Sequence, residues 1–216
     1  MLMSKEDPYS DKRHRMVQEQ IAGRGVADKQ VLAAMSKVKR HLFVPESARP
    51  SAYNDHPLGI GYEQTISQPY IVGYMTEALK LNNNDKVLEI GIGSGYQAAV
   101  LAEIVKEVYS IEVVKELAEL TQKRIEALGY RNIHIKYGDG FDGWEEHAPY
   151  DAIMVTAAPE EVPPRLLEQL AVGGRMVVPM GLIHQELYLF KKTEKGIEKK
   201  RLLPVRFVPM IKGNIN

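Results

Sequence analysis

The segment Val87–Gln97, with the sequence VLEIGIGSGYQ, restricts the fold more than any other part of the chain. Mainly apolar residues come first, followed by glycines at the alternating positions Gly91, Gly93 and Gly95. This order predicts a strand, a tight turn and a helix, with glycines where the backbone bends sharply or approaches a ligand. A nucleotide-like ligand is the expected occupant of such a turn.

The spacing of the glycines disfavours a dinucleotide site. Counted from Gly91, the fingerprint G-x-G-x-x-G/A requires a small residue where this chain has Tyr96. Together with Glu89 at the strand end, the loop instead resembles the E-x-G-x-G-x-G loop of class I S-adenosylmethionine methyltransferases. The resemblance implies that S-adenosylmethionine binds here and leaves as S-adenosylhomocysteine. Its expected contacts in this loop are Glu89, Gly91, Gly93 and Gly95.

Apolar runs alternate with helical patterns from Lys86 onward, which predicts βαβ units and a parallel sheet covered on both faces. We expect strands at 87–90, 107–111, 133–137, 152–156 and 175–179, and helices at 97–105, 115–128 and 164–170. Late segments at 186–192, 197–203 and 205–209 are expected to be antiparallel edge strands, the first two joined by a turn at Lys195-Gly196. The predicted fold class is α/β, a Rossmann-like, doubly wound and mostly parallel sheet with antiparallel C-terminal edge strands.

The first 80 residues form an N-terminal extension in this interpretation. Apolar residues at helical spacing predict two short helices between Asp11 and Arg40, separated at Gly23-Arg24-Gly25. The segment 41–61 is rich in Pro, Tyr and Asn and predicts an irregular loop with one short strand pair. Pro69 suits the first position of a helix that ends near Leu81. We therefore expect a single domain over 1–216, with a helical and substrate-loop extension at 1–80 and the Rossmann-like core at 81–216.

Composition narrows the choice of partners. Lys+Arg and Asp+Glu both number 28, so no net charge draws the chain to nucleic acid or to an anionic membrane. The N-terminus is polar, and no run of about 18 consecutive apolar residues occurs. We expect a cytoplasmic monomer without nucleic-acid or membrane partners. Cysteine is absent, and the histidines lack metal-ligand spacing, so no metal site is expected.

Carboxylates follow the second and third predicted strands. Glu112 stands where a ribose diol could donate hydrogen bonds to it, although a solvated strand-end glutamate is the alternative. Asp139 could accept a hydrogen bond from the exocyclic amine of adenine, with Gly140 in a tight turn against the ring, and an ordinary Asp-Gly turn is the alternative. Since open α/β sheets bind ligands at the carboxyl ends of their strands, Glu112, Asp139 and Gly140 are predicted at the cofactor site.

The loop after the fourth predicted strand bears on the methyl acceptor. Methyltransferases that alkylate amide or ring nitrogens often carry Asn or Asp, two prolines and an aromatic residue there, whereas this chain has VTAAP at 155–159. A carboxylate acceptor, with a pKa of roughly 3.5 to 4.3, is already ionised at neutral pH and chiefly needs alignment. This argument permits carboxyl methylation without selecting it, because a base could lie elsewhere in the fold or on the substrate.

A second resemblance selects carboxyl methylation among the possible reactions. The segment GYEQTISQPY at 61–70 resembles the signature that precedes the core domain of protein-L-isoaspartate O-methyltransferases. Supporting segments are LEIG at 88–91, GSGY at 93–96, APYDAI at 148–153, TAA at 156–158, GGR at 173–175 and RFVP at 206–209. The resemblance extends over about 26–213. It implies methyl transfer to the free α-carboxyl of L-isoaspartyl residues in damaged proteins and peptides, which begins their repair through a succinimide.

The same resemblance supplies site residues. Ser67, the serine of the T-I-S-Q-P motif, is the implied catalytic residue, and we expect its hydroxyl to orient the carboxylate rather than to act as a nucleophile. The alternative is that Ser67 caps the helix that begins near Pro69, and the two roles can coexist. The resemblance also implies cofactor contacts from Ile66 and Ser67, and substrate contacts from Thr65, Ser67, Val208 and Pro209. For Val208 and Pro209 the alternative is an edge strand that ends at proline.

Two other functions stay open on the sequence alone. One is a methyltransferase with the same core that acts on a small molecule. The other is a binding protein that has kept the nucleoside fold without the chemistry, against which the intact glycine loop, Glu112, Asp139 and Ser67 all argue.

Overall fold

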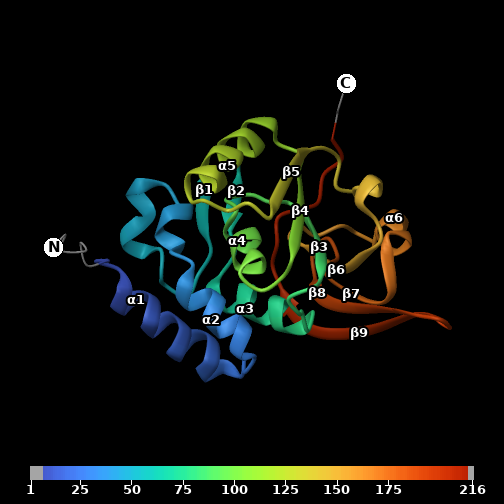
Figure 1. Ribbon diagram of the computed structural model, residues 1–216, viewed down its shortest axis with the longest axis horizontal. Helices are drawn as coiled ribbons and strands as arrows, with labels where there is room; N and C mark the ends of the chain where they lie inside the picture. The colour runs from blue at the N-terminus through green and yellow to red at the C-terminus, as the bar shows by residue number, and fades with distance from the viewer. Residues whose placement is uncertain (1–6, 214–216) are drawn as a thin grey trace.

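A computed structural model describes residues 7–213 and shows a twisted sheet with helices on both faces (Figure 1). The strand order is β5-β4-β3-β6-β7-β8-β9, in which β3 to β7 run parallel and β8 and β9 are antiparallel to their neighbours. The strands are β3 (Lys86–Ile90), β4 (Glu107–Glu112), β5 (Ile133–Tyr137), β6 (Tyr150–Val155), β7 (Leu170–Met180), β8 (Gln185–Thr193) and β9 (Gly196–Val205).

The central strands are buried on both faces because alternate side chains enter two different cores. Val87 of β3 belongs to a larger hydrophobic cluster with the N-terminal helices, while its neighbour Leu88 belongs to a smaller cluster that includes Leu166. The helices after β3, β4 and β6 are α4 (Tyr96–Ala102), α5 (Lys115–Ala127) and α6 (Pro164–Glu168). This arrangement explains the nearly continuous apolar runs of the sequence.

The N-terminal extension packs on the larger cluster. It contains α1 (Ser10–Arg15), η1 (Met16–Ile21), η2 (Ala22–Arg24), α2 (Lys29–Lys37), η3 (Arg40–Phe43), η4 (Glu46–Ser51) and α3 (Pro69–Ala78). The Asp28 side chain caps α2 by accepting hydrogen bonds from the N–H groups of Gln30 and Val31. Pro69 opens α3, where its missing N–H leaves no helix hydrogen bond unmade.

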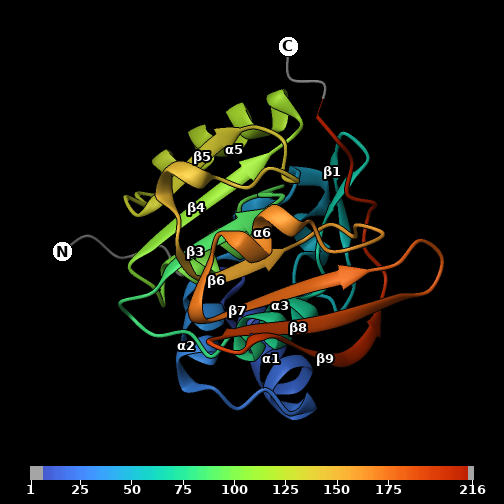
Figure 2. The same cartoon turned by 90° about the vertical axis from the view of Figure 1, so that its right-hand side faces the viewer.

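A short antiparallel hairpin precedes α3. Its strands are β1 (Leu58–Gly61) and β2 (Gln64–Ile66), and its turn consists of Tyr62 and Glu63 with φ angles of 52° and 58°. Both non-glycine turn residues therefore adopt the left-handed conformation that such tight hairpins require. Figure 2 shows this hairpin beside the C-terminal segment, at the end of the sheet to which the parallel strands point.

The α/β fold class and the central parallel strands are confirmed, as is the short strand pair in the loop. The expected third late strand at 205–209 is wrong. β9 continues to Val205, and the following residues leave β8 and make one isolated parallel bridge, between Ala158 and Pro209. The helix expected at 164–170 ends at Glu168, since Leu170 already pairs with Tyr150 in the sheet.

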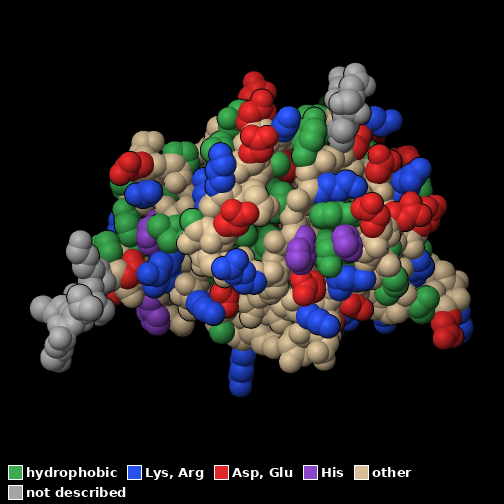
Figure 3. Space-filling view, turned by 45° about the horizontal axis from the view of Figure 1, so that its top comes forward, with side chains coloured by type: hydrophobic (Ala, Val, Ile, Leu, Met, Phe, Trp, Pro, Cys, Tyr) green, Lys and Arg blue, Asp and Glu red, His purple; other side chains and the backbone are tan. Residues whose placement is uncertain are grey.

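Charges of both signs are interspersed on the face shown in Figure 3, in line with the equal totals of 28 basic and 28 acidic residues. Within residues 7–213, no helix has the length and apolar character needed to cross a membrane.

Candidate active site

A cavity of about 800 Å³ opens at the carboxyl ends of the parallel strands. The strand order reverses between β3 and β6, and open α/β sheets bind ligands at such a switch point. Three parts of the chain line the cavity: the hairpin with the residues before and after it (Pro57, Gln64, Thr65, Ser67, Gln68, Ile71), the strand ends and the loops that follow them (Ile90, Gly91, Gly93, Ile111, Glu112, Val113, Gly140, Thr156, Ala157) and the C-terminal segment 204–211. The fold thus brings residues far apart in sequence to one site.

The glycine loop is shaped by close contacts. Gly91 has a φ of 87°, and a Cβ atom there would lie 2.7 Å from Oγ1 of Thr156, whose hydroxyl donates a hydrogen bond of 2.6 Å to the Gly91 carbonyl. Gly91 and Gly93 line the cavity, whereas Gly95 lies outside the lining and precedes α4. A Cβ atom on Gly95 would lie 2.8 Å from Cγ2 of Thr121 in α5, so this glycine permits close helix packing.

Helix α5 supports the same loop from outside the cavity. The Thr121 hydroxyl donates to the Gly93 carbonyl at 2.6 Å, and Nη1 of Arg124 donates to the Ser94 carbonyl at 2.9 Å. These side chains satisfy carbonyl groups that the tight turn leaves without helix or sheet partners. The sequence analysis did not single out Thr121 or Arg124 and cited Thr156 only as part of the VTAAP and TAA segments, because nothing local distinguishes a side chain that supports the loop from any other of its type.

Glu112 ends β4 and lies in the cavity wall, as expected. Its Oε2 accepts from the Gly93 N–H at 2.9 Å, and its Oε1 accepts from the N–H groups of Val113 and Val114 at 3.0 and 3.1 Å. Burial raises the pKa of Glu112 above its ordinary value, although the three N–H donors oppose that shift. A carboxylate offers about four acceptor positions, so the backbone bonds leave room for a ligand hydroxyl at Oε2.

Glu89 does not line the cavity. Its side chain is fully buried in the sheet, beside its cross-strand partner Ser110, whose hydroxyl donates to Oε2 at 2.5 Å. Burial raises the pKa of Glu89 to about 8, and the nearby carboxylate of Glu112 adds to the increase. The Glu89 side chain therefore links β3 to β4 inside the sheet and does not reach the cavity.

Asp139 follows β5, and its carboxylate is engaged in local structure. Oδ1 accepts from the Phe141 N–H at 2.9 Å, and Oδ2 accepts from the Gly213 N–H at 3.0 Å. The adjacent Gly140 lines the cavity, while Asp139 itself does not. The carboxylate fixes both its own turn and the C-terminal segment at the cavity edge.

Ser67 lines the cavity between β2 and α3. The N-cap position of α3 is occupied by Gln68 and not by Ser67, and no side chain caps this helix. The alternative that Ser67 caps the helix is therefore contradicted. No hydrogen bond joins the Ser67 hydroxyl to another residue within 7–213, which leaves it available to a ligand. Thr65 also lines the cavity, whereas Ile66 is 4% exposed and packs in the larger core.

The segment after β9 closes the opposite side of the cavity. Val208 and Pro209 both belong to the lining. The Ala158 N–H donates to the Val208 carbonyl, and the Met210 N–H donates to the Ala158 carbonyl, each at 2.8 Å. The segment is thus fixed to the loop after β6, which explains why it does not continue the sheet.

Comparisons with known proteins identify a family for this chain. The family model described as protein-L-isoaspartate(D-aspartate) O-methyltransferase matches residues 11–215. A protein-L-isoaspartate O-methyltransferase of Picosynechococcus sp. is 58% identical over 204 residues, which cover 94% of this chain and 92% of that protein. One from Opitutus terrae is 52% identical over 206 residues, covering 94% and 88% of the two chains.

Solved structures lead to the same family. A protein-L-isoaspartate O-methyltransferase structure superposes with a TM-score of 0.83 at 32% identity, over 94% of this chain and 67% of that one. A second, described as a putative enzyme of this kind from Plasmodium falciparum in complex with S-adenosyl-L-homocysteine, gives a TM-score of 0.81 at 28% identity, over 93% and 99% of the two chains. By sequence and by fold, this chain belongs to the protein-L-isoaspartate O-methyltransferase family.

Proposed function

We propose that this protein transfers the methyl group of S-adenosylmethionine to the free α-carboxyl of L-isoaspartyl residues in peptides and proteins. The observation that carries the proposal is the composition of one cavity. The glycine loop and Glu112 form one wall, and Ser67 and the segment with Val208 and Pro209 form the others. A donor and an acceptor bound to these walls meet inside the same space.

The residues present suit S-adenosylmethionine. The Gly91 and Gly93 backbone lines the cavity without side chains, which gives the methionine part of the ligand close access. Oε2 of Glu112 can accept from a ribose hydroxyl, and the apolar side chains of Ile90, Ile111 and Val113 can cover an adenine ring. Gly140 lines the cavity and offers a backbone without a side chain to the adenine ring, while the Asp139 carboxylate holds the adjacent turn. When bound, the cofactor supplies an electrophilic methyl group on a positively charged sulfur.

The acceptor needs little activation. A carboxylate is ionised at neutral pH, so the enzyme has to hold its oxygen in line with the methyl carbon and the sulfur and to exclude water. The Ser67 hydroxyl can donate a hydrogen bond to the other carboxylate oxygen and so fix its orientation. No proton has to leave the nucleophile, so the acceptor needs no general base; among residues 7–213, Glu112 and Arg206 are the ionisable side chains in the cavity lining.

Methylation prepares the residue for repair. The ester carbonyl is a better target than a carboxylate for the backbone nitrogen of the following residue, and that attack forms a succinimide and releases methanol. Water then opens the ring at either carbonyl, to give aspartyl or isoaspartyl linkages. Repeated cycles return the second product to the enzyme, so damaged chains are converted stepwise to normal ones.

The protein substrates have to present a flexible backbone kink. The acceptor is a main-chain carboxyl, and the cavity is bounded by a hairpin and by the C-terminal segment rather than by a flat surface. We also propose that the protein acts as a cytoplasmic monomer. The absence of cysteine from the sequence suits a reducing compartment.

The decisive experiment measures transfer of labelled methyl from S-adenosylmethionine to a short L-isoaspartyl peptide and to the same peptide with normal aspartate. We expect label in the isoaspartyl peptide alone, in base-labile form as an ester requires. Binding of S-adenosylhomocysteine with label in neither peptide would contradict the proposal and favour a small-molecule acceptor.

A further inference from the structure

Gln185 holds the C-terminal segment through both ends of its side-chain amide. Its Oε1 accepts from the Phe207 N–H at 2.6 Å, and its Nε2 donates to the Phe207 carbonyl at 3.1 Å. The two bonds together occupy both backbone groups of a single residue. Gln185 is the first residue of β8 and pairs with Val205 at the end of β9, so it stands where the segment leaves the sheet.

The other attachment of the segment is independent of Gln185. Ala158, in the loop after β6, bonds to the Val208 carbonyl and to the Met210 N–H. Phe207 is thus fixed from β8, and its neighbours are fixed from the loop after β6. Each anchor takes different backbone groups, so the course of residues 207–210 is determined on both sides.

These anchors leave specific main-chain groups free. Among the hydrogen bonds between residues 7–213, none involves the Val208 N–H or the Pro209 carbonyl. Both residues line the cavity. A peptide backbone carries donors and acceptors of the complementary kind, so an extended substrate can pair with these groups as an added strand does.

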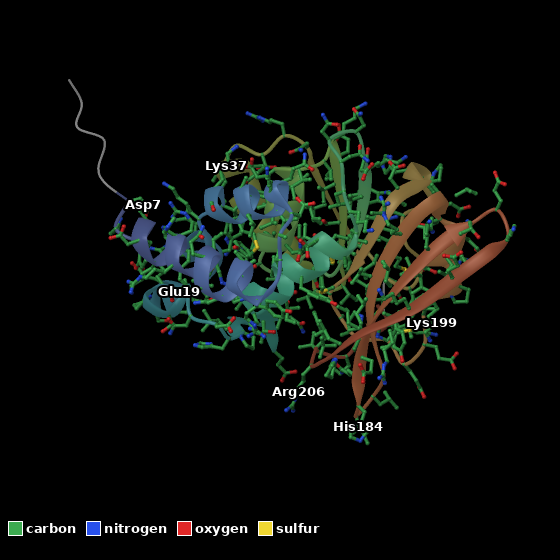
Figure 4. All side chains as sticks on the ribbon, turned by 90° about the horizontal axis from the view of Figure 1, so that it is seen from below. Asp7, Glu19, Lys37, His184, Lys199 and Arg206 are labelled. Atoms are coloured by element: carbon green, nitrogen blue, oxygen red, sulfur yellow. The ribbon has the colours of Figure 1, made fainter. Side chains whose placement is uncertain are left out.

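Gln185 reaches the cavity only indirectly, through its hydrogen bonds to Phe207. His184 and Arg206, which adjoin Gln185 and Phe207 in sequence, lie near the same end of the molecule (Figure 4), and Arg206 also lines the cavity. Gln185 lies outside the cavity lining, whereas Phe207 lies in it and packs against the larger core. The glutamine can therefore influence substrate binding only through the segment that it holds.

We propose that Gln185 is a positioning residue for the protein or peptide substrate, acting by fixing Phe207 so that the free groups of Val208 and Pro209 face the acceptor backbone. The proposal rests on the proposed methyl transfer to isoaspartyl residues. We call the two hydrogen bonds between Gln185 and Phe207 the clamp. The proposal requires that loss of the clamp weakens substrate binding while the cofactor, held on the opposite wall by the glycine loop and Glu112, binds as before.

The test compares Gln185→Met, which keeps the length of the side chain without its hydrogen bonds, with wild type. We expect the KM for an isoaspartyl peptide to rise about fivefold to tenfold, as the loss of one or two net hydrogen bonds predicts. The kcat and the dissociation constant of S-adenosylhomocysteine should stay within about twofold of wild type. Gln185→Glu keeps the acceptor for the Phe207 N–H and should give an intermediate KM.

Gln169 provides a matched control. Its Oε1 accepts from the Trp144 N–H and its Nε2 donates to the Asp142 carbonyl, both at 2.8 Å, and none of these residues lines the cavity. Gln169→Met should lower the thermal midpoint without raising the peptide KM. An equal rise in KM for both variants would overturn the proposal, as would an unchanged KM for Gln185→Met, or a joint loss of kcat and cofactor affinity.

Hydrogen exchange separates this inference from the proposed function, since it needs no turnover. In Gln185→Met the Phe207 amide should exchange faster than in wild type, while the Met210 amide, held by Ala158, keeps its protection. Unchanged exchange at Phe207 would refute the clamp itself. A wild-type protein that shows the clamp by exchange but methylates no isoaspartyl peptide would refute the proposed function instead.

Discussion

The carboxylate of Glu112 accepts a hydrogen bond of 2.9 Å from the backbone N–H of Gly93, a residue 19 positions earlier in the chain. The bond links the end of β4 to the glycine loop after β3, two neighbouring parallel strands. The proposed ribose acceptor and the proposed cofactor loop therefore hold each other in place. The wall of the cavity proposed for the cofactor is fixed by hydrogen bonds within the protein.

Glu112→Gln should weaken S-adenosylhomocysteine binding by about 10- to 100-fold, the range for hydrogen bonds that involve a charged group. The amide keeps one acceptor oxygen but places N–H donors against the N–H groups that Glu112 now accepts. Isothermal titration calorimetry measures the change. Glu116→Gln is the control, since Glu116 is exposed in the first turn of α5 and its side chain makes no hydrogen bond to another residue of the described range 7–213. Equal affinities in wild type and Glu112→Gln would remove Glu112 from the cofactor site.

Ser67→Ala should lower kcat about 10- to 100-fold with little change in cofactor affinity, because the hydroxyl is proposed to orient the acceptor carboxylate. The hydroxyl has no hydrogen bond to another residue within 7–213, so its loss should leave stability nearly unchanged. Steady-state kinetics with an isoaspartyl peptide, beside thermal unfolding, checks both parts. Ser36→Ala, in which the lost hydroxyl bonds only to the Leu32 carbonyl of its own helix, serves as the control. A parallel loss of kcat and cofactor binding in Ser67→Ala would contradict the orienting role.

The sequence predicted the parts of the fold that local patterns determine. The strand, glycine turn and helix around Gly91 follow from buried apolar runs and from backbone conformations that few other residues adopt. The convergence of Glu112 and Gly140 at one cavity follows from the parallel order of the strands. These features depend on near neighbours in sequence or on a general rule of α/β sheets.

Other features depend on contacts that local sequence patterns do not predict. The pattern VRFVP at 205–209 suits a strand, but the Gln185 side chain takes both backbone groups of Phe207 and the segment turns to Ala158. Glu89 stands in a motif associated with cofactor binding, yet its place in β3 pairs it with Ser110 inside the sheet. Both outcomes follow from register and from the path of distant segments, which periodicity alone does not fix.

Thr121→Val should lower the free energy of unfolding by about 1 to 3 kcal/mol, because the substitution removes the donor to the Gly93 carbonyl and leaves a polar group unpaired at a buried site. The shape of the side chain is nearly preserved, so packing changes little. Affinity for S-adenosylhomocysteine should fall with stability, since the loop loses one of its two hydrogen bonds from α5 and keeps that of Arg124. Thr121→Ser retains the hydroxyl and should bind the cofactor nearly as wild type does. Urea unfolding and calorimetry of both variants test the pair, and a Thr121→Val protein with wild-type affinity would show that the loop keeps its shape without the Thr121 hydrogen bond.

Glu89 makes stability depend on pH, and the direction follows from its pKa. Burial raises the pKa from 4.5 to about 8 in the folded state, so between these values the native protein keeps a proton that the unfolded chain has released. The stabilisation is fully present below about pH 4.5, declines on the order of 1 kcal/mol per pH unit as pH rises, and is lost once pH passes about 8. Glu89→Gln mimics the protonated carboxyl and removes this titration. Urea unfolding at a series of pH values should therefore show wild type losing stability relative to Glu89→Gln between pH 5 and 8, and parallel stability curves would mean that Glu89 is ionised in the native protein.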